Sequence, residues 1–314
     1  MNIFEKLYTV IILFAVVIGI SLGQVEGIRT NAEIAITPLL VAMLYVTFLQ
    51  IPIAEIKKAF KNIKFTYTAV IINFVWTPLF AWLLAMVFLG DHPALYIGFI
   101  MLMVTPCTDW YLIFTGIAKG NVALSTAILP LNLLLQVILL PIYLLIFGGT
   151  TGVIELAFLV ESIFLILFIP LVLAVLTNVL LRHKPQVREN LISNLSMLPI
   201  LFLSLAIVAM FASQGQLLLA HLELIWLITI PILLFFIVNL YVSQKVGQLM
   251  KFSNPARTSL SLTTLARNSP IALAIAMTAF PDQPLISLTL VICPLLELPI
   301  LAIITQVLLF ISKN

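Results

Sequence analysis

The sequence predicts an all-α polytopic membrane protein whose ten transmembrane helices form two inverted five-helix repeats. Composition, the spacing of apolar segments and the placement of basic residues lead to this prediction. Of the 314 residues, 63% are hydrophobic and only 9% are charged, whereas a soluble protein carries roughly 25% charged residues. A soluble core cannot absorb that much apolar surface, so we expect most of the chain to lie in lipid.

Apolar segments long enough to cross roughly 30 Å of hydrocarbon follow one another with short connections. The first segment lacks the basic leader and the cleavage site of a signal peptide, so we interpret it as a retained span. No stretch has the composition of a soluble domain or a disordered tail. The predicted spans are 7–23, 36–53, 66–89, 93–118, 122–147, 154–180, 190–213, 222–243, 257–280 and 285–311.

Basic residues support ten spans, because this number places nearly all of them on one side of the membrane. The opposite side receives only Arg29, and Arg267 lies inside a span. Positive charges mark the cytoplasmic side, so we expect a multi-pass membrane protein with both termini in the cytoplasm. The residues on that side are Lys6, Lys57, Lys58, Lys61, Lys64, Lys119, Arg182, Lys184, Arg188, Lys245, Lys251, Arg257 and Lys313.

The fourth span contains Thr105-Pro106-Cys107-Thr108-Asp109, a poor choice for the centre of a lipid-embedded helix. Proline removes a backbone donor, and an unpaired intramembrane aspartate costs roughly 2.5–3.5 kcal/mol. One interpretation is a kinked helix with a purely structural role. We favour a broken helix that lines a polar cavity, since non-helical backbone at membrane depth survives only there or inside protein.

A second interruption, 266–270, lies in the ninth span, five spans after the first. Thr37-Pro38 in span 2 and Leu198-Pro199 in span 7 give a weaker match at the same offset. An odd number of spans per half makes the halves inverted, and interrupted helices at corresponding positions indicate a secondary-transporter site at the membrane midplane. The predicted repeats are therefore 1–150 (spans 1–5) and 151–314 (spans 6–10).

Asp109 and Arg267 occupy the two corresponding interruptions and are the most costly side chains within the spans. If the broken helices cross, pairing lowers the desolvation cost of both residues. One interpretation is a permanent ion pair that fastens the halves together. In the other, Arg267 offers positive charge to an anionic substrate or takes the place of a bound cation, and Asp109 accepts protons or acts as a switchable counter-charge.

The other candidate site residues are polar groups near the interruptions or in neighbouring spans. Those at the interruptions can cap broken helices instead of binding a ligand, and Glu297 can be a helix-bridging carboxyl instead of a proton or ion site. Asn73 and Asn239 favour interhelical hydrogen bonds. The candidate substrate- or ion-binding set is Cys107, Thr108, Asp109, Asn132, Gln136, Arg267, Asn268, Ser269 and Glu297, with helix breaks at Pro106 and Pro270.

Cys107, beside the first interruption, has two interpretations. A soft thiolate suits a thiophilic metalloid such as trivalent arsenic or antimony, whereas a lone buried cysteine is more often a small packing residue. The second cysteine, Cys293, lies in another span, and the spacing predicts neither a disulfide framework nor a zinc site. We expect no bound metal, no cofactor and no nucleic-acid partner.

The motifs at 105–111 and 266–270 resemble those of the superfamily of bile acid:sodium symporters and Acr3-type arsenite permeases, in particular the bacterial branch labelled arsenic resistance protein. The resemblance covers the whole chain and implies a location in the bacterial plasma (inner) membrane. It implies a panel of spans 1, 2, 6 and 7, a core of spans 3–5 and 8–10, and broken spans 4 and 9 that cross in the core. Pro106-Cys107-Thr108 resembles the Pro-Cys-Thr of arsenite permeases, whose cysteine is required for transport in the family.

Two positions depart from the family pattern. Sodium-coupled members carry a span-9 Glu-x-x-x-Gln-Asn, whereas this chain has Thr263-x-x-x-Arg267 before its asparagine, so the sodium-ligating glutamate is absent. We therefore expect coupling to protons through Asp109 or Glu297 and doubt a role for sodium. Asp109-Trp110 also replaces the small apolar residues of the arsenite permeases.

The sequence thus predicts a secondary active transporter, either a proton- or potential-driven permease of a small anion or oxyacid such as arsenite, or a sodium- or proton-coupled symporter of organic anions. An intramembrane enzyme is disfavoured, because no lysine lies in a span and Asp109 has no second aspartate in its span. A sensor is disfavoured by the lack of a cytoplasmic output domain. The sequence does not predict the oligomeric state or the direction of transport.

Overall fold

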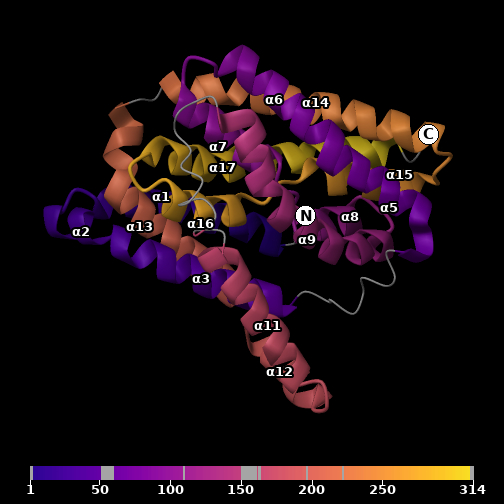
Figure 1. Ribbon diagram of the computed structural model, residues 1–314, viewed down its shortest axis with the longest axis horizontal. Coiled ribbons are helices and arrows are strands. Elements are labelled where there is room, and N and C mark those ends of the chain that lie inside the picture. The colour runs from indigo at the N-terminus through magenta and orange to yellow at the C-terminus, as the bar shows by residue number, and fades with distance from the viewer. Residues whose placement is uncertain are drawn as a thin grey trace. The chain divides into compact units, whose positions relative to one another are not determined.

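The computed structural model describes residues 3–50, 60–108, 110–149, 161, 164–195, 197–220 and 223–311. Every named element within them is a helix, which confirms the all-α prediction (Figure 1). Six of the described helices are long and apolar enough to cross a membrane, judged by length and composition. The ten-span count and the inverted repeats stay predictions. Shorter apolar helices cover Leu13–Leu22, Pro93–Met103, Phe164–Leu180 and Ser269–Ala279.

The chain divides into two compact units. Unit 1 comprises 1–51, 155–222 and 270–291. Its elements are α1 (Ile3–Leu22), α2 (Glu26–Asn31), α3 (Glu33–Gln50), the π-helical η5 (Phe164–Phe168), α11 (Ile169–Leu180), α12 (Pro185–Leu195), α13 (Leu198–Ala220) and nearly all of α16 (Ser269–Ala279). Within this unit α1 and α3 pack on α13, and α11 packs on α3 (Figure 1).

Glycines set the close approach of α1 to α13. A Cβ atom added to Gly19 would lie 2.6 Å from Cβ of Phe211, and one added to Gly23 would lie 2.6 Å from the carbonyl oxygen of Ala212. Both distances are far shorter than real Cβ contacts, and small residues four apart are the usual means by which membrane helices approach closely. The α1–α13 interface therefore depends on the missing side chains.

Unit 2 comprises 52–154, 223–269 and 292–314. Helix α17 (Pro284–Ile311) has residues in both units. The other elements of unit 2 are the 3-10 turn η2 (Phe60–Asn62), α5 (Ile63–Ile71), the π-helical η3 (Ile72–Trp76), α6 (Thr77–Phe88), α7 (Pro93–Met103), α8 (Trp110–Ile117), α9 (Val122–Gly148), α14 (Glu223–Leu249) and α15 (Asn254–Leu265).

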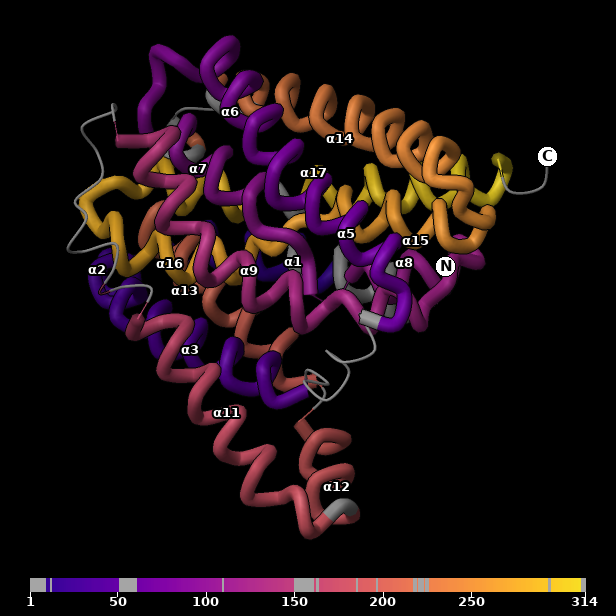
Figure 2. Tube along the Cα trace, turned by 45° about the vertical axis from the view of Figure 1, so that its right-hand side comes forward, coloured from indigo at the N-terminus to yellow at the C-terminus, as the bar shows by residue number. Residues whose placement is uncertain are grey.

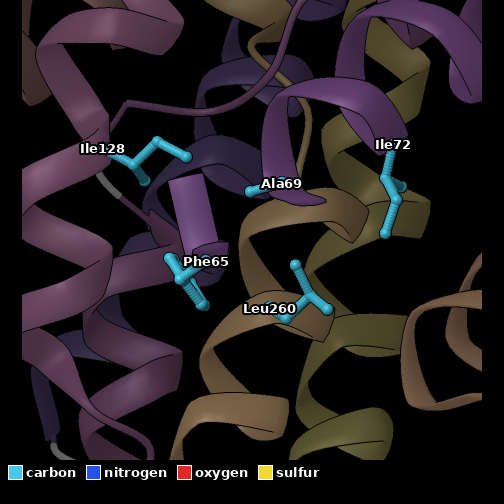
Figure 3. Packing of buried hydrophobic residues seen from close by; sticks show 5 residues of the cluster. All are labelled: Phe65, Ala69, Ile72, Ile128 and Leu260. Carbon is cyan, nitrogen blue, oxygen red and sulfur yellow. The ribbon is translucent and has the colours of Figure 1, made fainter. Parts of the chain in front are cut away.

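Helix α15 is the central element of unit 2, because it packs against α5, α8, α9 and α14 (Figure 2). Leu260 of α15 joins a buried apolar cluster with Phe65, Ala69, Ile72 and Ile128 (Figure 3). The cluster brings α5, α9 and α15 together one turn before the polar end of α15. It therefore positions the residues that follow Leu265.

A tyrosine from α9 supports the π-helical segment η3. Pro78 has no backbone N–H to donate to the carbonyl of Phe74, four residues earlier. The hydroxyl of Tyr143 donates to that carbonyl instead. This contact fixes α9 against η3 at the point where the helical hydrogen bonding is irregular.

Candidate functional site

Two interrupted helices form the site, and both interruptions lie where the sequence predicts them. Helix α7 ends at Met103 and α8 begins at Trp110, on either side of Pro106. Helix α15 ends at Leu265, and α16 begins at Ser269 with Pro270 in its first turn. Proline fits a first turn because its missing N–H has no helical acceptor there.

The two interruptions pair with each other as extended backbone, in an antiparallel bridge centred on Pro106. The backbone N–H of Cys107 donates to the carbonyl of Ala266 over 3.0 Å, and that of Asn268 donates to the carbonyl of Thr105 over 2.7 Å. Non-helical backbone at membrane depth must find partners inside the protein. Each interruption supplies them for the other.

The carbonyls at the end of α7 are capped from both interruptions. The hydroxyl of Thr105 lies 2.9 Å from the carbonyl oxygens of Met101 and of Leu102. Nη1 of Arg267 donates to the carbonyl of Met103 over 2.8 Å. These groups have no partner within their own helix, so a residue from the second interruption completes the end of the first broken helix.

Arg267 also caps the end of its own helix, α15. Its Nε donates to the carbonyl of Leu265 over 3.1 Å, and its Nη2 donates to the carbonyl of Thr264. Nδ2 of Asn73 donates to the carbonyl of Thr263 over 3.4 Å. Helix C-termini carry partial negative charge and favour a cation, and the guanidinium lies at two of them.

The surroundings of Arg267 enclose its side chain, which is only 2% exposed. Nη2 lies 3.2 Å from Oδ1 of Asn73, and Cζ lies 5.4 Å from the ring centre of Phe235 on α14. The guanidinium thus donates to three backbone carbonyls and one amide oxygen while an aromatic ring faces it. The guanidinium of Arg267 therefore takes the position of a cation bound at the ends of α7 and α15.

Glu297 joins the site through the main chain. Its Oε1 accepts a hydrogen bond from the backbone N–H of Arg267 over 2.7 Å, and its side chain is buried. A carboxylate oxygen is a strong acceptor for a backbone N–H. Glu297 therefore holds the second interruption in its extended conformation.

Most residues of the predicted set meet at the paired interruptions. Nδ2 of Asn268 donates to Oγ1 of Thr108 over 3.1 Å, and both side chains are buried together with Cys107 and Ser269. Asp109 lies outside the described residues, so its pairing with Arg267 stays a prediction.

Comparison with known proteins gives the family. The model of the Sodium Bile acid symporter family matches residues 37–221, more than half of the chain. The chain belongs to this family. It is therefore a multi-pass membrane transporter, in agreement with the apolar helices and with the resemblance found in the sequence.

Three relatives align over nearly the whole length of this chain. Arsenical-resistance protein Acr3 of Corynebacterium glutamicum is 22% identical and covers 92% of this chain and 83% of that protein. An uncharacterized transporter of Synechocystis sp. is 23% identical, with 98% and 88% covered. Acr3 of Alkaliphilus metalliredigens is 21% identical, with 97% and 92% covered.

Two residues of the predicted site, Asn132 and Gln136, lie on α9. Among the described residues, no side-chain hydrogen bond joins them to the interruptions. Asn132 and Gln136 are buried, and within the described part of the chain the nitrogen and oxygen of both side-chain amides have no hydrogen-bond partner. The described candidate site residues thus fall into two groups. One group lies at the interruptions, and the other consists of Asn132 and Gln136, whose amides have no partner among the described residues.

Sequence reasoning assigned two asparagines to interhelical contacts, and both make them. Asn73 bonds to α15 and to Arg267, and Oδ1 of Asn239 accepts from Nε1 of Trp76 over 2.7 Å. The aromatic partner Phe235 was missed. No signal marked it, because the chain contains 21 phenylalanines and most serve packing or lipid contact.

Proposed function

We propose that this chain is a secondary active transporter of a small oxyacid, with arsenite as the first candidate, and that it runs without sodium at the paired interruptions. One observation carries the proposal: the guanidinium of Arg267 lies on the carbonyls that end α7 and α15. Interrupted transporter helices use such carbonyls to coordinate their coupling cation. Here a side chain supplies the cation.

Electrostatics oppose a sodium ion beside that side chain. Two like charges 4 Å apart repel by about 4 kcal/mol at an effective dielectric constant of 20, which corresponds to roughly a thousandfold loss of affinity. The carbonyls of Met103, Thr264 and Leu265 already accept from the guanidinium. Sodium would have to compete with a covalently attached cation for the same oxygens.

Substrate chemistry follows from the cysteine at the first interruption. Cys107 is buried, and its backbone pairs with the second interruption. A thiolate is a soft ligand for trivalent arsenic, and two relatives are named arsenical-resistance proteins. We propose that Cys107 contacts the substrate and that Thr108, Asn268 and Ser269 supply the polar contacts.

Coupling then falls to a proton-binding carboxyl. Glu297 is buried against the backbone of the second interruption, so a change in its charge acts directly on that segment. Asp109 is the other candidate, as proton acceptor or as counter-charge to Arg267. A panel-and-core cycle is the proposed motion, which is supported by the presence of both interruptions in one compact unit up to Ser269.

Arsenite transport in proteoliposomes tests the proposal. Counterflow of arsenite should run at the same rate, within about twofold, in sodium and in choline buffer, and an imposed pH gradient should accelerate net flux. Cys107→Ser should abolish arsenite flux, whereas Cys293→Ser, the matched control at the second cysteine, should retain it. Strong sodium stimulation of the wild type would contradict the coupling proposal, and an unaffected Cys107→Ser variant would contradict the substrate.

An organic-anion symporter is the second candidate, and the description of the family favours it. The same vesicles distinguish it from the first candidate. Sodium-stimulated uptake of a labelled bile acid or small carboxylate, unchanged by Cys107→Ser, would select the symporter and reject the oxyacid permease.

A further inference from the structure

Helix α9 carries a buried polar stripe. At about 100° per residue, its four members lie within about 40° of one another around the helix axis. They extend over about 27 Å of helix, most of the roughly 30 Å of a hydrocarbon core. We call this the α9 stripe; its members are Ser125, Asn132, Gln136 and Tyr143.

Both ends of the α9 stripe are bonded to neighbouring elements of unit 2. The carbonyl of Ser125 accepts from the hydroxyl of Tyr111 over 2.7 Å, and its side chain lies 3.4 Å from the hydroxyl of Thr115. At the other end the hydroxyl of Tyr143 donates to the carbonyl of Phe74. The ends are therefore satisfied by protein groups.

The middle of the stripe is not satisfied. Asn132 is 0% exposed and Gln136 is 1% exposed, and among the residues described here neither amide nitrogen nor amide oxygen has a partner. Native proteins rarely leave buried polar atoms unpaired, and such atoms indicate a missing water or ion. Four of them on adjacent turns of one helix indicate a site.

Contacts on either side of the two amides show which elements lie next to this part of α9. Ile128, one turn before Asn132 on α9, belongs to the buried apolar cluster that contains Ala69 and Ile72 (Figure 3). Tyr143, beyond Gln136, contacts η3. The end of α5 and η3 therefore adjoin α9 on either side of the two amides along the chain.

The adjoining stretch, from the end of α5 to Thr77, is itself polar and irregular. It contains the π-helical η3, and π turns are frequent at functional sites. The hydroxyl of Thr77, directly after η3, is also buried without a partner among the described residues. Asn73 in η3 accepts a hydrogen bond from Arg267, so positive charge already adjoins this stretch.

We propose that Asn132 and Gln136 form a binding site for an uncharged hydroxyl-bearing ligand, either bound water or a hydroxylated solute. An amide offers two N–H donors and one carbonyl acceptor, so only a ligand that both donates and accepts satisfies the pair. A carboxylate would leave the carbonyl oxygens unpaired, and a cation would leave the N–H groups unpaired. The existence of this site does not depend on the proposed transport function. Its occupation by a solute does rest on that function.

Hydroxyl-radical footprinting in 18O-labelled water tests for bound water, because radicals formed at an ordered water label adjacent side chains. Tyr143 and Tyr96 form a matched pair, since both are 8% exposed and both donate to a backbone carbonyl. We expect at least threefold more label on Tyr143 than on Tyr96. The excess should disappear in the double variant Asn132→Leu/Gln136→Met, or in Gln136→Met alone if the double variant does not fold.

Thermal shift tests for a solute, with boric acid and arsenous acid as neutral hydroxylated probes and sodium acetate as the anion. A solute site gives a rise in Tm of about 2 °C or more with boric acid, which is lost in the amide variants and kept in Cys107→Ser. This second control separates the site from the thiol chemistry of the proposed function, so either proposal can fail alone.

Each outcome decides the inference. Excess label without a thermal shift assigns the site to water, and a shift that depends on the amides assigns it to a solute. Equal labelling of the two tyrosines, together with no amide-dependent shift, overturns the proposal. Two other results also overturn it. A rise in Tm with acetate alone would mean that the amides bind an anion. A double variant that melts at a higher temperature than the wild type, with equal labelling of the two tyrosines, would mean that the amides are buried without any ligand.

Discussion

Unit 2 contains two buried polar groups that have opposite surroundings. Arg267 at the paired interruptions is charged, yet its guanidinium makes four hydrogen bonds and faces an aromatic ring. Asn132 and Gln136 are neutral, yet within the described residues their side chains make no hydrogen bond. Charge therefore does not tell which polar group in a membrane interior is available to a ligand.

The difference teaches that hydrogen-bond capacity is the better guide. A saturated group such as Arg267 acts through its position: it holds two helix ends together and excludes a second cation. An unsaturated pair has binding capacity that its own protein leaves unused. Substitutions should therefore affect mainly stability at the first place and mainly ligand binding at the second.

Arg267→Met should give the largest effect. It leaves the carbonyls of Met103, Thr264 and Leu265 without their donor, and each buried unsatisfied group costs about 1–3 kcal/mol. We expect a loss of several kcal/mol in unfolding free energy, measured by denaturation in detergent micelles. Arg182→Met, at an exposed arginine, should stay within about 0.5 kcal/mol. A loss below about 1 kcal/mol at Arg267 would mean that its contacts are not what joins the helix ends.

Glu297 sharpens the comparison, because its charge and its acceptor oxygen can be removed separately. Glu297→Gln keeps an oxygen for the backbone N–H of Arg267 and should cost under about 1 kcal/mol, whereas Glu297→Met removes the acceptor and should cost about 1.5–3 kcal/mol. We expect both variants to lose acceleration of arsenite flux by a pH gradient. Gradient-driven flux that persists in Glu297→Gln would move the coupling proton to another group.

The interruptions were predictable because they are costly. Proline and charged residues inside a span have few physical explanations, so Pro106 and Arg267 indicate broken helices from the sequence alone. The partners of Arg267 were not predictable, since most are backbone carbonyls and every residue has one. Asn132 and Gln136 were singled out from the sequence as polar residues within a span. Whether their amides find partners depends on what the neighbouring helices offer, and the sequence carries no such information.

Asn73→Ala should have a smaller effect than Arg267→Met. It removes one acceptor from the guanidinium and one donor from the carbonyl of Thr263, and together these should cost about 1–3 kcal/mol. The comparison predicts a second effect, since Asn73 belongs both to the Arg267 site and to η3, which contacts the α9 stripe at Tyr143. Thermal shift with boric acid should therefore decrease in this variant. Asn239→Ala, at the other interhelical asparagine, should leave the shift unchanged, and an equal decrease in both would indicate general loosening.

Tyr143→Phe should be the mildest change and the most discriminating. It removes one hydroxyl that donates to the carbonyl of Phe74, and Tyr96→Phe removes one that donates to the carbonyl of Phe147. Each should cost about 1 kcal/mol in unfolding free energy. Of the two tyrosines, only Tyr143 belongs to the α9 stripe. Only the removal of its hydroxyl should therefore alter the boric acid shift or raise the footprinting label on neighbouring side chains. If the two variants differ in no respect but stability, the stripe is packing, and the unpaired amides need an explanation within their own turn of α9.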